Sequence, residues 1–314
     1  MKVFVAGASG ALGRQLVPRL VAAGHEVVGM TRSEAKQDLV RGFGARPAVA
    51  DAFDANAVMG AVAEAQPEVV VHQLTAIPGN LEPRHFDRDF ALTNRLRTEG
   101  TDNLLAAARA AGARRFLAQS YTGWPYARTG GPVKSEEDPL DPEPQAQFRP
   151  MLDAIRRLED TVTGTADVEG LILRYGAFYG PGTSIGLPEG EVVRTVRKRG
   201  FPVVGGGAGV WSFVQIEDAA AATTAAVERG APGLYNVVDD DPAPVSEWLP
   251  ALAEAVGAKP PRRVPRWLGR IAAGGAAVTL MTEARGASNT KAKREFGWQL
   301  KYPSWRKGFR DGMN

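Results

Sequence analysis

The first part of the chain alternates short apolar runs with longer stretches of helical periodicity. Residues 2–6 (KVFVA) predict a buried strand, and residues 12–24 predict an amphipathic helix. Further strand-like apolar runs lie at 25–30, 45–51, 68–74 and 114–120. Helical segments separate these runs, and the longest of them extends from about Thr93 to Gly112. Strands alternating with helices in this way predict an α/β fold with a doubly wound parallel sheet.

The pattern changes after residue 120. Residues 121–150 contain clusters of turn formers and predict an ordered surface loop, after which a helix at 151–163 and a strand at 169–176 resume the alternation. The segments beyond are shorter and mixed, which is typical of a smaller lobe. We therefore expect two interleaved units, a doubly wound domain of 1–176 plus about 211–238 and a smaller C-terminal lobe of about 177–210 and 239–314.

Composition narrows the possible chemistry. The 314 residues include no cysteine, which excludes disulfides, zinc–cysteine sites and thiol nucleophiles and fits a cytoplasmic protein. The longest apolar stretch, 268–281, is short and contains Arg270, so we expect no membrane partner. Basic residues are dispersed apart from a short cluster at 194–199, and we expect no nucleic acid partner either. We expect a monomer or homodimer that binds a small-molecule substrate and no metal.

Three glycines connect the first strand to the first helix. In a strand–turn–helix unit the first glycine permits a tight turn, the second lets backbone N–H groups approach a pyrophosphate, and the third allows close helix packing. Gly7, Gly10 and Gly13 suit these roles. The spacing predicts a dinucleotide site at the start of the chain.

The end of the second strand indicates which dinucleotide. NAD-binding proteins place an acidic residue about 20 residues beyond the glycine turn, where it accepts hydrogen bonds from the ribose. Here Thr31 and Arg32 occupy that place. A guanidinium is a planar cation that pairs well with a phosphate. We therefore predict NADP as the cofactor in preference to NAD.

Five segments follow the patterns of one enzyme family in the order of that family: GASGALG, VVVHQLTA, TNRLRTEGTDNLLAAARAAG, LRYGAFYGPGT and FVQIEDAAAA. On these segments the chain resembles the extended short-chain dehydrogenase/reductases, the NAD(P)-dependent epimerase/dehydratase family. The resemblance implies a Rossmann fold with a substrate-binding lobe, and it places Asp51 near the adenine. The cofactor-binding residues that it implies are Gly7, Ser9, Gly10, Ala11, Leu12, Gly13, Thr31, Arg32, Asp51, Leu74, Thr75, Ala76, Asn94 and Ser120.

The chain departs from this family at the acid/base pair. The family uses a Tyr-x-x-x-Lys pair, in which the lysine lowers the pKa of the tyrosine so that its hydroxyl exchanges a proton with the substrate. The corresponding helix reads MLDAIRRLEDTV, with Met151 and Ile155 in the two positions if Glu159 aligns with the acid that follows the pair. The usual proton donor is therefore missing. His72 lies within an apolar strand and is expected to be a core residue.

Other hydroxyl groups remain as catalytic candidates. Tyr121 or Thr122 falls where the family places its catalytic Ser or Thr, and Tyr175 is a further candidate. Nucleotide-sugar members carry an arginine just before the FVQIED-like segment, whereas this chain has a tryptophan there, which favours a more apolar substrate. The residues expected to bind that substrate are Trp124, Tyr126, Arg174, Phe178 and Trp211.

Three functions are compatible with these patterns. The first is an NADP-dependent oxidoreductase with an atypical active site that acts on a small to medium, largely apolar carbonyl or alcohol. The second is a redox-neutral dehydratase, epimerase or cyclase that uses NAD(P) transiently or structurally. The third is a non-catalytic NADP-binding sensor. Three observations distinguish these functions. Steady NADPH consumption supports the first, product formation without net consumption supports the second, and cofactor binding without turnover supports the third.

Overall fold

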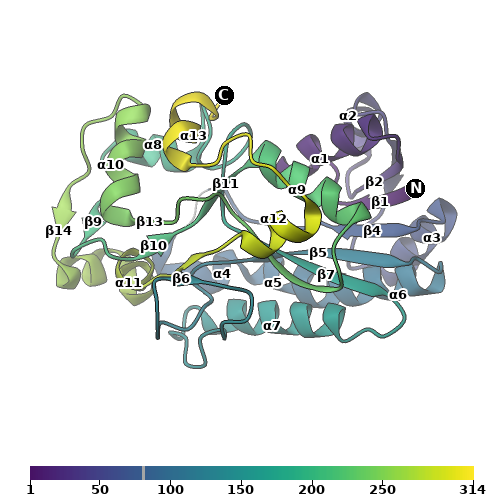
Figure 1. Cartoon of the computed structure of the whole chain (residues 1–314), viewed down its shortest axis with the longest axis horizontal. Coiled ribbons are helices and arrows are strands. Elements are labelled where there is room, and N and C mark those ends of the chain that lie inside the picture. The colour runs from purple at the N-terminus through teal and green to yellow at the C-terminus, as the bar shows by residue number, and fades with distance from the viewer. Residues whose placement is uncertain (80–81) are drawn as a thin grey trace.

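A seven-stranded parallel sheet forms the centre of the molecule (Figure 1). The computed structural model describes residues 1–79 and 82–314. The strand order in the sheet is β12-β7-β5-β4-β1-β2-β3. The strands of the sheet are β1 (Lys2–Ala6), β2 (Glu26–Thr31), β3 (Arg46–Val49), β4 (Val69–His72), β5 (Arg115–Tyr121), β7 (Glu169–Tyr175) and β12 (Gly233–Val237). The strand order reverses direction at β1 and β4, which is the topological switch point of a doubly wound sheet. The predicted fold class is confirmed.

Helices cover both faces of the sheet. Those described in this half are α1 (Ala11–Ala22), α2 (Gln37–Gly42), α3 (Ala55–Ala65), α4 (Phe86–Asp89), α5 (Ala91–Arg95), α6 (Thr101–Ala110), α7 (Arg149–Thr163) and α9 (Ile216–Glu228), with 3-10 turns η1 (Glu34–Lys36) and η2 (Pro83–His85). One face is covered by α1 and α9, and the other by α3, α6 and α7. Because both faces are covered, the central strands are almost continuously apolar.

A second core lies beside the carboxyl ends of these strands. Its helices are α8 (Glu191–Arg197), α10 (Val245–Ala255), α11 (Arg266–Thr282) and α13 (Trp305–Asp311). Its short strands are β8 (Ala177–Tyr179), β9 (Val203–Val204), β10 (Val210–Trp211), β11 (Phe213–Gln215), β13 (Ala243–Pro244) and β14 (Arg263–Val264). Phe213, Trp248, Trp305 and Phe309 pack together at its centre.

The C-terminal segment is shared between the two cores. We assigned 239–314 to the smaller lobe, yet α12 (Thr290–Phe296) packs against the large sheet. Phe296 lies against Tyr235 of β12, with 4.4 Å between ring centroids. The loop predicted at 121–150 contains only β6 (Val133–Lys134) before α7 begins, and β6 pairs with β15 (Gly286–Ala287). Within the described residues, no helix combines the length and apolar character that crossing a membrane requires.

The long helix predicted from Thr93 to Gly112 is interrupted. It consists of α5, a π-helix η3 (Leu96–Gly100) and α6. The π-turn contains one more residue than an α-turn and shifts the helical phase, so Leu96 and Arg97, although consecutive, are both buried. The imidazole of His72 reaches the carbonyl of Leu96 at 3.2 Å, while its Nδ1 accepts the N–H of Leu74. His72 is therefore a core residue, as predicted, and supports this turn.

Candidate active site

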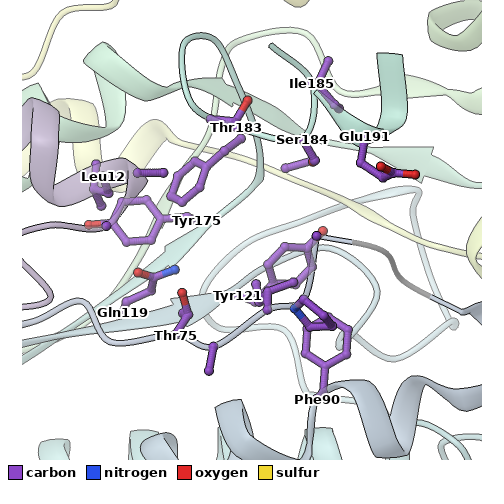
Figure 2. A pocket seen from close by; sticks show the side chains of 18 of the residues that line it. Leu12, Thr75, Phe90, Gln119, Tyr121, Tyr175, Thr183, Ser184, Ile185 and Glu191 are labelled. Atoms are coloured by element: carbon purple, nitrogen blue, oxygen red, sulfur yellow. The ribbon is translucent and has the colours of Figure 1, made fainter. Parts of the chain in front are cut away.

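A cleft of about 1290 Å³ runs along the carboxyl ends of the sheet strands, between the two cores. This is the place at which doubly wound folds bind their ligands. Figure 2 shows the cleft from close by, with Tyr121 and Phe90 across from the segment that carries Ser184, Ile185 and Glu191, and with Leu12 of α1 on the other side of the view. The glycine turn lines the cleft on the side of Leu12.

The glycine turn fits a pyrophosphate. Gly7 has φ of 96°, and a Cβ on Gly13 would lie 2.3 Å from the Gly7 carbonyl oxygen, so both positions require glycine. Helix α1 begins after Gly10 with no side-chain cap and no acidic residue in its first turn. Its first N–H groups are therefore available to an anion at the positive end of the helix dipole. Ser9, Ala11 and Leu12 line the cleft beside them.

The end of β2 provides a basic corner. Thr31, Arg32 and Asp51, which are expected at the cofactor, all line the cleft, and the hydroxyl groups of Thr31 and Ser9 lie 3.4 Å apart. Lys36, which sequence reasoning missed, lines the same end. It follows β2 within the turn η1, so its position resulted from a turn that the sequence pattern did not indicate. Arg32 and Lys36 thus bring two cations to this end of the cleft.

The middle of the cleft is lined by the segments that follow β4 and β5. Leu74, Thr75 and Ala76 line it, and the N–H of Ala76 donates to the Thr93 hydroxyl at 3.0 Å. Ser120 also lines it. Asn94, expected at the cofactor, does not line the cleft. Its side-chain oxygen instead accepts a hydrogen bond from Arg97 at 3.3 Å.

Tyr121 and Arg97 lie together in the wall of this part of the cleft. Burial raises the pKa of the Tyr121 hydroxyl to about 12, although the positive charge of Arg97 acts in the opposite direction. A hydroxyl with this pKa can donate a hydrogen bond but is a poor base near neutral pH. Sequence reasoning missed Arg97 because an arginine on an amphipathic helix is normally exposed. The π-turn is the reason for its burial.

Two residues expected at the substrate belong to a buried network instead. Arg174 is 3% exposed and pairs with Glu159 of α7 through two nitrogens, at 2.8 and 2.5 Å. Its third nitrogen donates to the hydroxyl of Tyr126, which in turn donates to Asn236. Neither Arg174 nor Tyr126 lines the cleft, so these two predictions of substrate contact were wrong. The network joins α7 to β7 and β12.

The other candidate hydroxyl groups line the cleft but already have protein partners. The Thr122 hydroxyl donates to Asn236 at 2.8 Å. The Tyr175 hydroxyl accepts a hydrogen bond from Gln73. It also lies 2.6 Å from the hydroxyl of Thr223, which donates to a backbone carbonyl. Burial raises the pKa of Tyr175. Tyr121 thus remains the candidate whose hydroxyl has no hydrogen bond to another described residue.

Aromatic side chains form the walls of the substrate end. Trp124 stacks on Phe148 at 4.6 Å, and Phe178 lies against Tyr175 at 5.2 Å. Trp211 packs on Trp248 of the lobe, and its indole N–H donates to a carbonyl of α11. Trp124, Phe178 and Trp211, which are expected at the substrate, line the cleft. Sequence reasoning missed Phe86, Phe90, Phe148 and Trp248, which lie on segments without a recognisable motif.

The helix that carries the acid/base pair in the family presents apolar groups here. Met151 lines the cleft, and Ile155 is fully buried against Phe148 and Met151. Neither side chain exchanges protons. Across residues 1–79 and 82–314, no three His, Asp or Glu side chains are arranged to hold a metal ion.

Comparisons with known proteins agree with this geometry. The sequence model of the NAD dependent epimerase/dehydratase family matches residues 3–237. A 3-diazoavenalumate denitrifying reductase from a Streptomyces species is 44% identical over 98% of this chain and 99% of its own length. A 2-alkyl-3-oxoalkanoate reductase from Stenotrophomonas maltophilia is 30% identical over 82% of this chain and 76% of its own.

Solved structures also match along the whole chain. The UDP-glucose 4-epimerase of Thermus thermophilus, solved in complex with NAD, superposes with a TM-score of 0.75 at 26% identity. The match covers 100% of this chain and 98% of that one. A nicotinamide dinucleotide is thus the supported cofactor.

Proposed function

Since this chain belongs to the NAD dependent epimerase/dehydratase family, we propose that it is an NADPH-dependent reductase that removes the diazo group of an aromatic acid. The observation that carries the proposal is the replacement of the acid/base pair. With Glu159 aligned to the acid that follows the pair, Met151 and Ile155 take its two positions, and the pKa of Tyr121 is raised to about 12. Epimerisation and alcohol oxidation both require removal of a hydroxyl proton, for which this tyrosine is poorly suited.

Reductive loss of a diazo group has no such requirement. Hydride would take the place of N2 on the ring carbon, so a diazonium cation and a hydride give an arene and N2, and no proton is transferred. A nicotinamide cofactor, when bound, would supply that hydride. The relative that is similar over its whole length carries the name of such a denitrifying reductase. The reaction thus fits a pocket without the family's proton donor.

The residues of this chain would bind and orient the reactants. The first turn of α1 would hold the pyrophosphate, and Arg32 with Lys36 would pair with the 2′-phosphate. The stacked pair of Trp124 and Phe148 offers an apolar face to an aromatic ring and excludes water from it. These roles require only binding and positioning.

Carbonyl reduction is a second candidate, favoured by the position of Tyr121 in the cleft wall and by the name of the oxoalkanoate reductase relative. In that reaction the Tyr121 hydroxyl would donate its proton to the oxygen of the reduced carbonyl. A raised pKa is tolerated in this role, because an alkoxide is a stronger base than a tyrosinate.

Deuterium-labelled NADPH tests both candidates. The enzyme is incubated with diazotised aminohydroxycinnamic acid and, separately, with a 3-oxoalkanoate, and products are analysed by mass spectrometry. We expect one deuterium on the ring carbon that lost N2, with one NADPH consumed per product and no such product without enzyme. Deuterium at the former carbonyl carbon of the oxoacid alone would favour the second candidate. Turnover of neither substrate would overturn both.

A further inference from the structure

Among the described residues, the cation in the wall of the cleft has no salt-bridge partner. Arg97 is 7% exposed and lines the cleft beside Tyr121. Among the described residues its single hydrogen bond goes from Nη1 to the side-chain oxygen of Asn94, at 3.3 Å. No carboxylate of the described chain lies within 4.0 Å of it. A guanidinium has five N–H donors, so most of its binding capacity remains free.

The surrounding charges leave this cation uncompensated. The charge of Glu159 acts on Arg97, but its two oxygens already bind Arg174, and one of them also accepts from Ser120. On the opposite wall Glu191 is paired with Arg194 of the same helix. Glu136 acts on Arg174 rather than on Arg97, so among the described residues no carboxylate forms a salt bridge with Arg97 itself. A nearly buried cation is unfavourable unless an anion or hydrogen bonds compensate it.

The π-turn holds this arginine in place. His72 is fully buried, and burial lowers its pKa to about 4, so the ring is neutral at physiological pH. Its Nδ1 accepts from the N–H of Leu74, and its Nε2–H therefore donates to the carbonyl of Leu96, the residue before Arg97. Burial also lowers the pKa of Arg97, to about 10, which leaves it charged at neutral pH. The fold thus fixes a permanent positive charge at an apolar wall.

We propose that Arg97 binds an anionic oxygen of the substrate, either the carboxylate or a ring phenolate of an aromatic acid. The planar guanidinium fork matches a carboxylate, and the aromatic walls of Trp124 and Phe148 receive the ring. This inference relies on the proposed function for the class of substrate, but not for the reaction. It makes Arg97 the residue that selects acids over neutral compounds of the same shape.

Binding of a coloured analogue in the presence of NADP⁺ tests this site. Hydroxynitrocinnamic acid reports its own ionisation by visible absorbance, and its methyl ester and methyl ether each remove one anionic oxygen. Arg97→Met should weaken binding of the acid by roughly 10- to 100-fold, as expected for loss of a charge-assisted pair. Arg97→Lys should retain part of the affinity. One of the two derivatives should bind wild type and Arg97→Met equally well. The oxygen that this derivative lacks as an anion is the oxygen that Arg97 binds.

Arg95→Met is the matched control. Arg95 belongs to the same helical segment, is exposed and pairs with Glu99 at 2.7 Å, and it does not line the cleft. Arg95→Met should leave the affinities for the acid and its two derivatives unchanged. Every variant should bind NADP⁺ as tightly as the wild type does. If folded Arg97→Met binds the acid as tightly as wild type, or if wild type binds the acid no more tightly than either derivative, the inference is overturned. Acid binding that depends on Arg97 without diazo turnover would refute the proposed reaction and retain the anion site.

Discussion

Arg32 determines the expected choice between the two nicotinamide cofactors. Its exposed guanidinium lines the cleft at the end of β2, together with Lys36. A charge-assisted hydrogen bond contributes about 1.5–3 kcal/mol, or roughly ten- to a hundred-fold in affinity. Arg32→Ala should weaken NADP⁺ binding by this factor and change NAD⁺ binding little, as measured by calorimetric titration. Arg19→Ala, which removes an exposed arginine at the far end of α1, is the control. Equal affinity of wild type for both cofactors would contradict the assignment.

Tyr121 distinguishes the two candidate reactions. In carbonyl reduction its hydroxyl supplies a proton, and loss of such help typically lowers the rate by about 10²–10⁴-fold. Diazo removal needs no proton from the protein. Tyr121→Phe should therefore reduce kcat for an oxoacid by at least the smaller factor while leaving diazo turnover and NADP(H) affinity nearly unchanged. The comparison variant is Thr122→Val, whose hydroxyl is already bound to Asn236. Loss of oxoacid turnover in Thr122→Val alone would transfer the role to Thr122.

Individual residues differed in how well the sequence predicted them. The glycines of the first turn and Arg32 were predictable because each follows a strand whose end is obvious from its apolar run. Arg97 was not, because its burial depends on a π-turn that no periodicity indicates. Arg174 was misplaced for a related reason. Its strand was correctly predicted, but its direction toward Glu159 depends on packing between β7 and α7.

Helix α7 is attached to the sheet by a buried ion pair. Glu159 and Arg174 are 5% and 3% exposed, so removing one partner leaves an uncompensated buried charge. Breaking such a pair costs about 3–5 kcal/mol, whereas an exposed pair contributes about 0–1 kcal/mol. Arg174→Met should lower the free energy of unfolding by the larger amount in urea titrations. Arg157 of the same helix α7 forms an exposed pair with Asp102. Arg157→Met should therefore change the free energy of unfolding little. Similar small losses in both variants would show that the buried pair contributes no special stability.

Element type was predictable where the elements are long and periodic. The strands of the large sheet and helices such as α1 and α7 contain enough residues to display their period. The lobe strands contain two or three residues each, and so short a segment has no readable alternation. Their positions follow instead from packing around aromatic side chains such as Trp248. The same applies to α12, whose assignment to the large sheet depends on Phe296 meeting Tyr235.

The site as a whole arises from the meeting of two cores. The sheet brings the glycine turn, the end of β2 and the end of β5 to one edge, which the alternation of strands and helices predicts. The lobe then covers that edge with aromatic side chains from β8, β10 and α10. The cofactor half of the cleft was therefore predictable from the sequence. The substrate half depends on long-range contacts and required the structure.

The acid stability of the whole molecule should depend on His72. Its pKa lies near 4 in the folded protein because of burial, against 6.5 for an unperturbed histidine. The folded state therefore binds this proton less readily than the unfolded state. The contribution of the neutral ring to the free energy of unfolding is fully present above pH 6.5. It is lost as the pH falls toward 4 and amounts to about 3 kcal/mol in total.

Other buried groups act with the opposite sign. Burial raises the pKa of Asp239 and Asp218, so their protonation favours the folded state as the pH falls. Only the difference between wild type and a His72 variant isolates the imidazole. His72→Gln should have a lower free energy of unfolding than wild type at neutral pH. Between pH 7 and pH 4 its free energy of unfolding should fall by about 3 kcal/mol less than that of wild type, as measured by urea unfolding across that range. Parallel pH profiles for the two proteins would mean that the imidazole keeps its ordinary pKa, and the neutral support for the π-turn that holds Arg97 would then have to come from another group.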